Sequence, residues 1–385
     1  MRGAVLLLAF GSVGVAQAAR ADIPVAPILV LDADYRQIPR DQEGYGGFAL
    51  PHVQLGAAVS MTDSVQAIAT LGYAGEGIGL SDTGIRVAPR HDVGVSVGYF
   101  KSPLFISGRD QFEERLPVPE RSMVVQALWP GRDLGVEGHW FPESWPLEAW
   151  LRISNGFDSS TGNDNASIAL SGRIDLALGR AHAGADPRET YGLRLGCGAL
   201  WDPKVDDRAS VTGKTPAGFV FWRAPIVSAA RTVVEGHLLL QAGPVQATVE
   251  GGAATEERTL DTDGNPNTPR VAQPSITAWG VAGEVAWTVT GEHRSGDAWP
   301  ATNAISGFGA IEVATRLERL KLGTGAVDVT SGGAWSTSAA VRWWLKPRLA
   351  LSVAGYGYAF DTAPLQTPGN TTTWLALARL TFSLR

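Results

Sequence analysis

Apolar and polar residues alternate with a period of two along most of the chain from about residue 19 onward. In residues 333–345, Trp335 and Val341 fall on one face, and Ser338 and Arg342 fall on the other. Residues 308–320 and 371–385 repeat this pattern. A strand with one apolar and one polar or charged face suits a barrel that has lipid outside and water inside.

Segments of this kind recur throughout the chain, with turn-forming residues between them. Sixteen of them begin near residues 27, 47, 65, 80, 92, 133, 147, 166, 190, 230, 245, 275, 306, 332, 348 and 371. An even number of strands allows the sheet to close, which lipid requires because it cannot satisfy a free strand edge. The sequence therefore predicts an all-β, antiparallel transmembrane β-barrel of about sixteen strands, wide enough for an aqueous channel.

The connections between the segments sort by length. If the first strand runs outward, the links from even to odd strands should be short periplasmic turns. Short turns do fall there, at residues 62–63, 89–91, 142–146, 242–244 and 346–347, and two longer links break the rule, at residues 178–189 and 289–305. The longest connection, residues 102–132, joins the fifth and sixth strands. A segment this long is most easily housed inside the lumen as a constriction.

Composition and the N-terminus fit an exported membrane barrel. Arg2, a short apolar run and the small residues at 16–18 predict a signal peptide over residues 1–18, which leaves the barrel at 19–385. Charged residues make up 18% of the chain against a typical ~25%. The 13 Trp and 46 Gly fit a barrel with aromatic girdles. A net charge of -6 argues against a nucleic-acid partner, and the single Cys197 excludes an internal disulfide.

Four short motifs, in order, resemble the phosphate-selective porin O and P family. They are GYFKSPLF at residues 98–105, ERS followed by PGRDLGV at 120–122 and 130–136, TVTGEHR at 288–294, and GFGAIEVATR at 307–316. The resemblance implies a sixteen-stranded outer-membrane porin of a Gram-negative bacterium, usually a homotrimer, with a long third loop folded into the lumen. It also implies passage of small hydrophilic solutes or of anions such as phosphate. The chain departs from the family at residues 342–344, where RWW replaces an N-W-Y pattern, and at its end, Arg385.

The charges expected to face the lumen are mixed in sign. Seven predicted wall positions are basic, namely Arg86, Arg152, Arg173, Arg194, Arg316, Arg342 and Arg379, and the predicted wall also holds nine Asp and Glu residues. The candidate residues for the pore constriction and lumen are Lys101, Arg109, Arg115, Glu120, Arg121, Arg132, Arg316 and Arg342. Arginine suits bidentate phosphate contacts, but these charges can also pair across strands and stiffen the wall. We expect weak charge selectivity.

Two other functions stay open at this stage: a barrel enzyme, and a structural or adhesive barrel. Residues 94–98 match the hydrolase pattern G-x-S-x-G, but they lie inside an alternating strand and not at a strand–helix turn. The six histidines are scattered singly, so no metal site or cofactor is predicted. Residues 261–267 resemble the start of a calcium loop but lack its closing acid.

Overall fold

The computed structural model describes residues 23–384 apart from 74–76, 143–144, 157–166, 179–190, 206–207, 210, 224–225, 228, 261–269, 293–306, 347, 365–366 and 368. The predicted signal peptide, residues 1–18, and the calcium-like segment, residues 261–267, therefore lie outside the described residues. Among the residues described, no helix is both long and apolar enough to cross a membrane.

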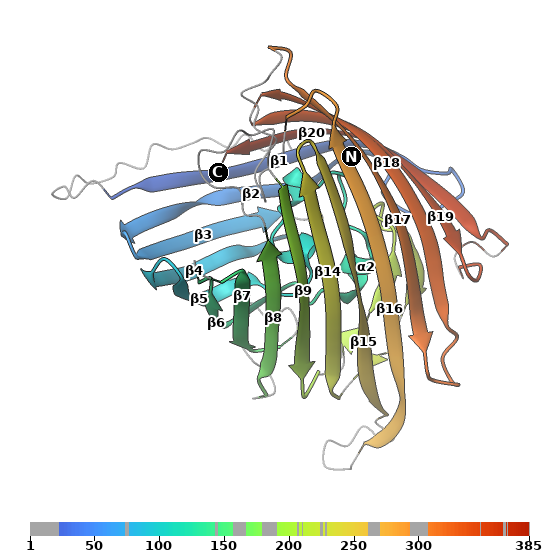
Figure 1. Ribbon diagram of the computed structural model, residues 1–385. Coiled ribbons are helices and arrows are strands. Elements are labelled where there is room, and N and C mark those ends of the chain that lie inside the picture. Colours follow the sequence, from blue (N-terminus) through green and yellow to red (C-terminus); the bar gives the residue numbers. More distant parts are fainter. Residues whose placement is uncertain are drawn as a thin grey trace, which may run out of the picture.

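Sixteen antiparallel strands form one closed barrel, in which the first strand pairs with the last (Figure 1). The strands are β1 (Val25–Gln37), β2 (Gly47–Thr62), β3 (Val65–Tyr73), β4 (Ile78–Arg90), β5 (Val93–Lys101), β6 (Arg132–Trp140), β7 (Leu147–Ser154), β8 (Ala169–Leu178), β9 (Tyr191–Asp202), β14 (Arg231–Ala242), β15 (Val245–Leu260), β16 (Val271–Thr288), β17 (Ala310–Thr324), β18 (Gly332–Lys346), β19 (Leu349–Phe360) and β20 (Thr372–Leu384). This confirms the predicted fold class, and the five predicted short turns fall at the junctions of consecutive strands.

Most strands expose one face and bury the other, as the alternation predicts, whereas β2 and β4 alternate only in part. On β18, Trp335 and Val341 are 51% and 50% exposed, whereas the residues that follow each of them, Ser336 and Arg342, are 2% and 1% exposed. The exposed face carries the apolar side chains and therefore faces lipid. The buried face looks into the barrel, where other parts of the chain cover it.

Tryptophans mark the two edges of the apolar band. Trp335 and Trp343 are eight residues apart on β18, which is ~27 Å along a strand. At a strand tilt of ~40° this corresponds to ~21 Å along the barrel axis. That height is close to the ~25 Å apolar band of transmembrane barrels.

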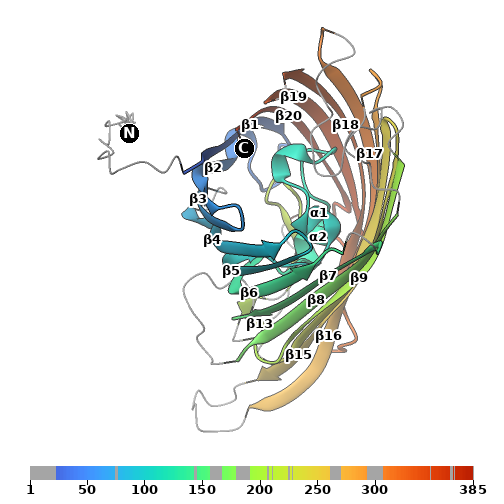
Figure 2. The same cartoon turned by 60° about the vertical axis from the view of Figure 1, so that its left-hand side comes forward.

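The loop between β5 and β6 folds into the lumen, as predicted (Figure 2). It contains α1 (Ile106–Arg109), a 3₁₀ turn η1 (Glu113–Arg115) and α2 (Met123–Leu128). Helix α2 packs against β15, β16 and β17. The small inward residues of the wall leave room for it, and they belong to the same buried apolar cluster as α2: Ala254, Ala278, Ala282, Ala286, Ala314, Ala340 and Ala354.

Four further short strands were not predicted. The connection from β9 to β14 contains β10 (Arg208–Ala209), β11 (Thr212–Lys214), β12 (Val220–Arg223) and β13 (Ile226–Val227), paired as β10–β13 and β11–β12. Sequence reasoning treated this segment as an outer loop, because runs of two to four residues carry no measurable alternation.

Two facing glycines hold β4 and β5 close together. Gly84 pairs with Gly98, and both have positive φ, +156° and +147°. A Cβ at residue 98 would lie 2.2 Å from the carbonyl oxygen of Thr83. Backbone atoms cannot move aside cheaply, so this contact requires glycine.

We therefore expect Gly98→Val to destabilise the barrel by about 3 kcal/mol or more. Gly138→Val on β6 is the matched control, because a Cβ there meets nothing within 4 Å. Urea unfolding of both variants in detergent measures the difference. Equal stability of the two variants would contradict this account of the Gly84–Gly98 contact.

Candidate pore constriction

Residues 102–131 cross the lumen between the end of β5 and the start of β6. Their apolar side chains pack against glycines of the opposite wall. A Cβ on Gly198, Gly252 or Gly280 would lie within 3.0 Å of Leu104, Phe105 or Val124, respectively. Phe105 is fully buried and has a φ of +57°, a strained value that its packing must offset. The wall thus has gaps at the places where the loop inserts.

Buried carboxylates of the wall accept the free N–H groups at the start of both helices. Glu250 on β15 accepts from the Ser107 backbone nitrogen at 3.2 Å, and Glu318 on β17 accepts from the Met123 nitrogen at 2.6 Å. Ser122 caps α2 as well, since its Oγ accepts from the Val125 nitrogen at 3.0 Å. Carboxylates at these positions satisfy backbone donors and complement the helix dipole.

Wall arginines donate to the carbonyl oxygens of the same loop. Arg316 Nη1 donates to Glu120 O at 2.9 Å and Arg342 Nη1 to Glu114 O at 3.3 Å. Arg379 Nη1 donates to Pro119 O at 2.5 Å. A hydrogen bond from a charged group contributes about 1.5–3 kcal/mol. Three strands, β17, β18 and β20, therefore hold the loop through its backbone.

The other side of the loop is held by ion pairs to β6 and β8. Arg109 Nη1 donates to Glu137 at 2.8 Å, and Arg173 pairs with Asp110 at 2.7 Å. Glu137 and Arg173 are themselves buried. The loop is thus fastened on most of the barrel's circumference.

The side facing β1–β4 is different, because a cavity of about 360 Å³ separates the loop from the wall there. The wall contributes Asp32, His52, Ser81, Arg132 and Arg379 to its lining, among others. The loop contributes Glu113, Leu116, Pro119, Glu120, Arg121 and Gln126. We call this cavity the aperture.

The charges of the aperture are paired. Arg121 lies 2.7 Å from Glu113, Arg132 lies 3.2 Å from Asp82, and Arg36 lies 3.1 Å from Glu120. Burial by itself would raise the pKa of Glu113, but the positive charges of Arg121 and Lys101 hold that pKa well below its ordinary value. Glu113 therefore stays ionised at neutral pH.

Opposite signs face each other across the aperture. The partly exposed charged side chains of the lining are Glu113 and Glu120 on the loop, at 26% and 19%. On the wall they are Arg132 and His52, at 20% and 18%. The aperture thus has an acidic loop side and a more basic wall side.

The eight predicted site residues divide into three groups. Glu120, Arg121 and Arg132 line the aperture. Lys101, Arg109 and Arg115 belong to the root of the loop: Lys101 donates to Gln111 O at 3.1 Å, and Arg115 lies over the Phe112 ring. Arg316 and Arg342 lie across the barrel and hold the loop from behind.

Sequence reasoning missed Asp32 and His52, which line the aperture. It placed Arg379 in the lumen wall and Glu113 among the charges of the constriction, but it proposed neither as a site residue. His52 Nδ1 lies 3.5 Å from Asp32 Oδ2. Asp32 and Asp34 occupy alternate positions directly after the apolar residues 25–31 of β1, and that pattern was the available signal for Asp32.

A second connection also folds inward, over the outer mouth. Phe221, on β12 of its β11–β12 hairpin, stacks on Phe360 with 4.9 Å between ring centroids. Arg36 Nη1 donates to Pro216 O at 2.8 Å, and the Tyr45 nitrogen donates to Ala217 O at 2.7 Å. This hairpin therefore covers the lumen beside β1, β2 and β19.

The candidate enzyme motif lies in the wall. Ser96 of the G-x-S-x-G match is 5% exposed, faces the lumen from β5 and pairs with Glu137 in the strand register. In the part of the chain that is described, no group of three or more His, Cys, Asp and Glu side chains could hold a metal ion.

The chain matches no family model and no curated protein. Solved structures do resemble it. The outer-membrane channel DcaP of Acinetobacter baumannii superposes with a TM-score of 0.55 at 10% identity, over 94% of this chain and 97% of that one. The anion-selective porin from Comamonas acidovorans gives 0.51 at 11%, over 94% and 99%.

A third similar structure is the trimer form of OmpT, an outer-membrane protein of Vibrio cholerae, with a TM-score of 0.50 at 11% identity over 94% of this chain and 99% of that one. At these identities the likeness concerns the fold. The barrel fold is that of the outer-membrane porins of Gram-negative bacteria, and together with the apolar outer face it places the chain in the outer membrane.

Proposed function

We propose that the chain is a porin through which small hydrophilic solutes diffuse passively, and that it is not an enzyme. The aperture carries this proposal. The loop is fastened to the wall at β6, β8, β15, β17, β18 and β20, yet a cavity lined by charged side chains remains beside β1–β4. A structural or adhesive barrel would gain nothing from a polar gap held open in this way.

Eight residues were predicted as pore constriction and lumen residues, and we propose two roles for them. Glu120, Arg121 and Arg132 form the constriction itself. Lys101, Arg109, Arg115, Arg316 and Arg342 position the loop that makes it. Wall charges that are engaged with the loop are less available to passing ions.

Weak selectivity follows from the pairing of charges in the aperture. The resemblance implies, more specifically, that phosphate passes through the pore. Arg132, which lies in the PGRDLGV motif and lines the aperture, supports that possibility. Because Asp82 already neutralises Arg132 at 3.2 Å, we propose a general pore with at most a small preference for anions.

Purified protein in a planar lipid bilayer should give stepwise, ohmic conductance, because on this proposal the aperture is the passage between the two ends of the barrel. The matched control is the same detergent preparation after heat denaturation. A correctly folded barrel that inserts but passes no current would remove the porin proposal in favour of a closed structural barrel.

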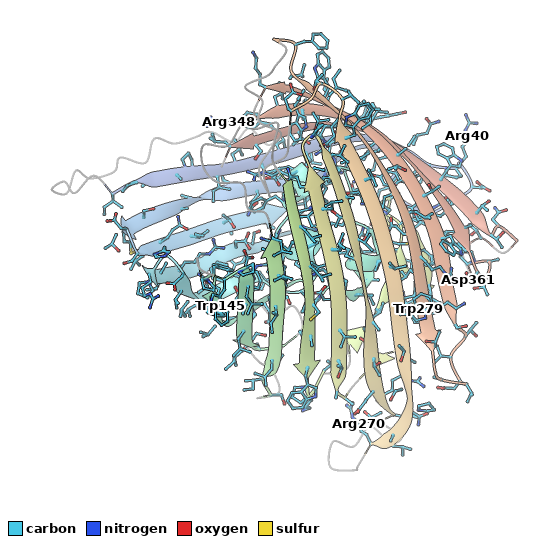
Figure 3. All side chains as sticks on the ribbon, viewed as in Figure 1. Arg40, Trp145, Arg270, Trp279, Arg348 and Asp361 are labelled. Atoms are coloured by element: carbon cyan, nitrogen blue, oxygen red, sulfur yellow. The ribbon has the colours of Figure 1, made fainter. Side chains whose placement is uncertain are left out.

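Charge variants of the aperture should move the zero-current potential in a salt gradient in opposite directions. Glu113→Gln leaves Arg121 without its partner and should shift the pore toward anions, whereas Arg132→Gln frees Asp82 and should shift it toward cations. Arg348→Gln, in the turn between β18 and β19 and outside the lining of the aperture, should have no effect (Figure 3 labels Arg348). A strong anion preference in the wild type that is lost in Arg121→Ala would show that the mixed-charge account is wrong.

We further propose a homotrimer whose subunits meet through β1–β5. The first tryptophan of the sequence is Trp129, so these five strands contribute no indole to the aromatic girdles of the wall, where Tyr35 and Phe48 are the aromatic side chains of β1 and β2 and are 49% and 90% exposed. Their outer face is nevertheless apolar, since the paired residues Leu55 and Leu71 are 55% and 51% exposed. A face that is apolar but lacks the interfacial indoles suits contact with another protein.

The double variant Leu55→Gln with Leu71→Gln should therefore dissociate the trimer. Leu195→Gln with Leu238→Gln is the matched control, because these residues pair on the opposite wall, between β9 and β14. Native mass spectrometry in detergent reads out the oligomer. Trimers that persist in the first variant, or are lost in the control, would contradict the assignment of this interface.

A further inference from the structure

Two cations face outward, toward lipid, on the outer half of β17. Leu317 marks the outward face of this strand and is 57% exposed, and Arg319 and Lys321 follow at the same phase. Positive side chains on the lipid-facing side of a barrel are costly at the membrane centre and tolerated near the interfaces. Their place along the strand therefore needs an explanation.

Tryptophans on both neighbouring strands set the height of the pair. Trp335 of β18 is the register partner of Arg319, whose guanidinium carbon lies 5.3 Å from the indole centroid. Trp279 of β16 is the register partner of Lys321. Interfacial indoles lie at the level of lipid head groups. Both cations are therefore at head-group height, near the ends of the strands that carry the long outer loops.

Asp361 joins the two cations. It accepts from Arg319 Nη1 and Nη2 at 2.7 and 2.8 Å, and from Lys321 Nζ at 2.7 Å. It reaches them across Gly333 of β18, where a Cβ would lie 2.7 Å from Asp361 Oδ2. Figure 3 shows Asp361 and Trp279 on the outer side of this wall.

The cluster keeps a net positive charge, because two cations and one carboxylate leave one positive charge. The hydrogen bond from Arg319 is the main cause that lowers the pKa of Asp361, so the carboxylate stays ionised. A guanidinium has five N–H donors and an ammonium three, so the pair can serve a second anion while it holds Asp361. Arg319, Lys321 and Asp361 are 14%, 28% and 20% exposed, which leaves them within reach of one.

We propose that Arg319 and Lys321 bind the phosphate group of a phosphorylated lipid in the outer leaflet. Phosphate oxygens at head-group height complement the charge and the donors of the cluster. The flanking faces of Trp279 and Trp335 pack on the upper part of the acyl chains. Asp361 orients both cations and occupies the site when no lipid is bound.

The test titrates folded protein in detergent with phosphorylated lipid A, and with the same glycolipid after removal of its phosphates, followed by native mass spectrometry. Arg319→Gln with Lys321→Gln should weaken binding of the phosphorylated form by about tenfold or more. Lys346→Gln, an exposed lysine at the other end of β18, is the matched control and should bind like the wild type. The dephosphorylated form should bind weakly to all variants.

Asp361→Asn separates a lipid site from a merely structural ion cluster. Removing the internal carboxylate frees both cations, so binding of the phosphorylated lipid should tighten, whereas a structural cluster would only lose stability. Wild-type affinity in the double variant, equal binding of the dephosphorylated form, or unchanged binding in Asp361→Asn would each overturn the proposal. If the double variant does not fold, Lys321→Gln is tested alone, because the ion pair between Arg319 and Asp361 remains in that variant. It too should bind the phosphorylated lipid more weakly than the wild type.

Discussion

The backbone of the inward loop is the constraint on which the rest of this lumen depends. When a segment is buried inside a barrel, its backbone N–H and C=O groups lose their hydrogen bonds to water, and each then needs a hydrogen-bond partner in the protein. Here the wall supplies them: Glu250 and Glu318 accept from the loop, and Arg316, Arg342 and Arg379 donate to it. Much of the wall's charge is therefore engaged in positioning the loop. This explains how a lumen rich in arginine and glutamate can leave only a balanced, small aperture.

The alternation of residues was sufficient to predict the sixteen strands, because lipid on one side imposes a strict rule on every second position. The inner face follows no such rule. Leu375 and Leu377 point inward from β20 and are buried, because the lumen contains an apolar core and not only water. The wall also has glycines at the places where the apolar side chains of the loop insert, namely Gly198, Gly252 and Gly280. The sequence alone does not explain these glycines, because their role depends on the position of the loop that packs against them.

The candidate site was predicted in part, for a related reason. Register assigns Arg316 and Arg342 to the lumen correctly, but it does not say what lies opposite each of them. Both lie behind the loop, whereas Arg132 lies in front of it, at the aperture. Asp32 and His52 belong to the aperture because the loop leaves β1–β4 uncovered. The path of the loop, which depends on many tertiary contacts, thus decides which charges line the pore.

On strand β17, two arginines have different surroundings because they lie on opposite faces of the sheet. Arg316 points inward, where Glu284 and Glu318 neutralise it and a loop carbonyl accepts from it. Arg319, only three residues later, points outward, where indoles and Asp361 surround it. The odd spacing places the two guanidiniums on opposite faces of one sheet. One is enclosed by protein, so all of its bonds are internal. The other borders lipid head groups, so part of its hydrogen-bonding capacity is directed to the membrane.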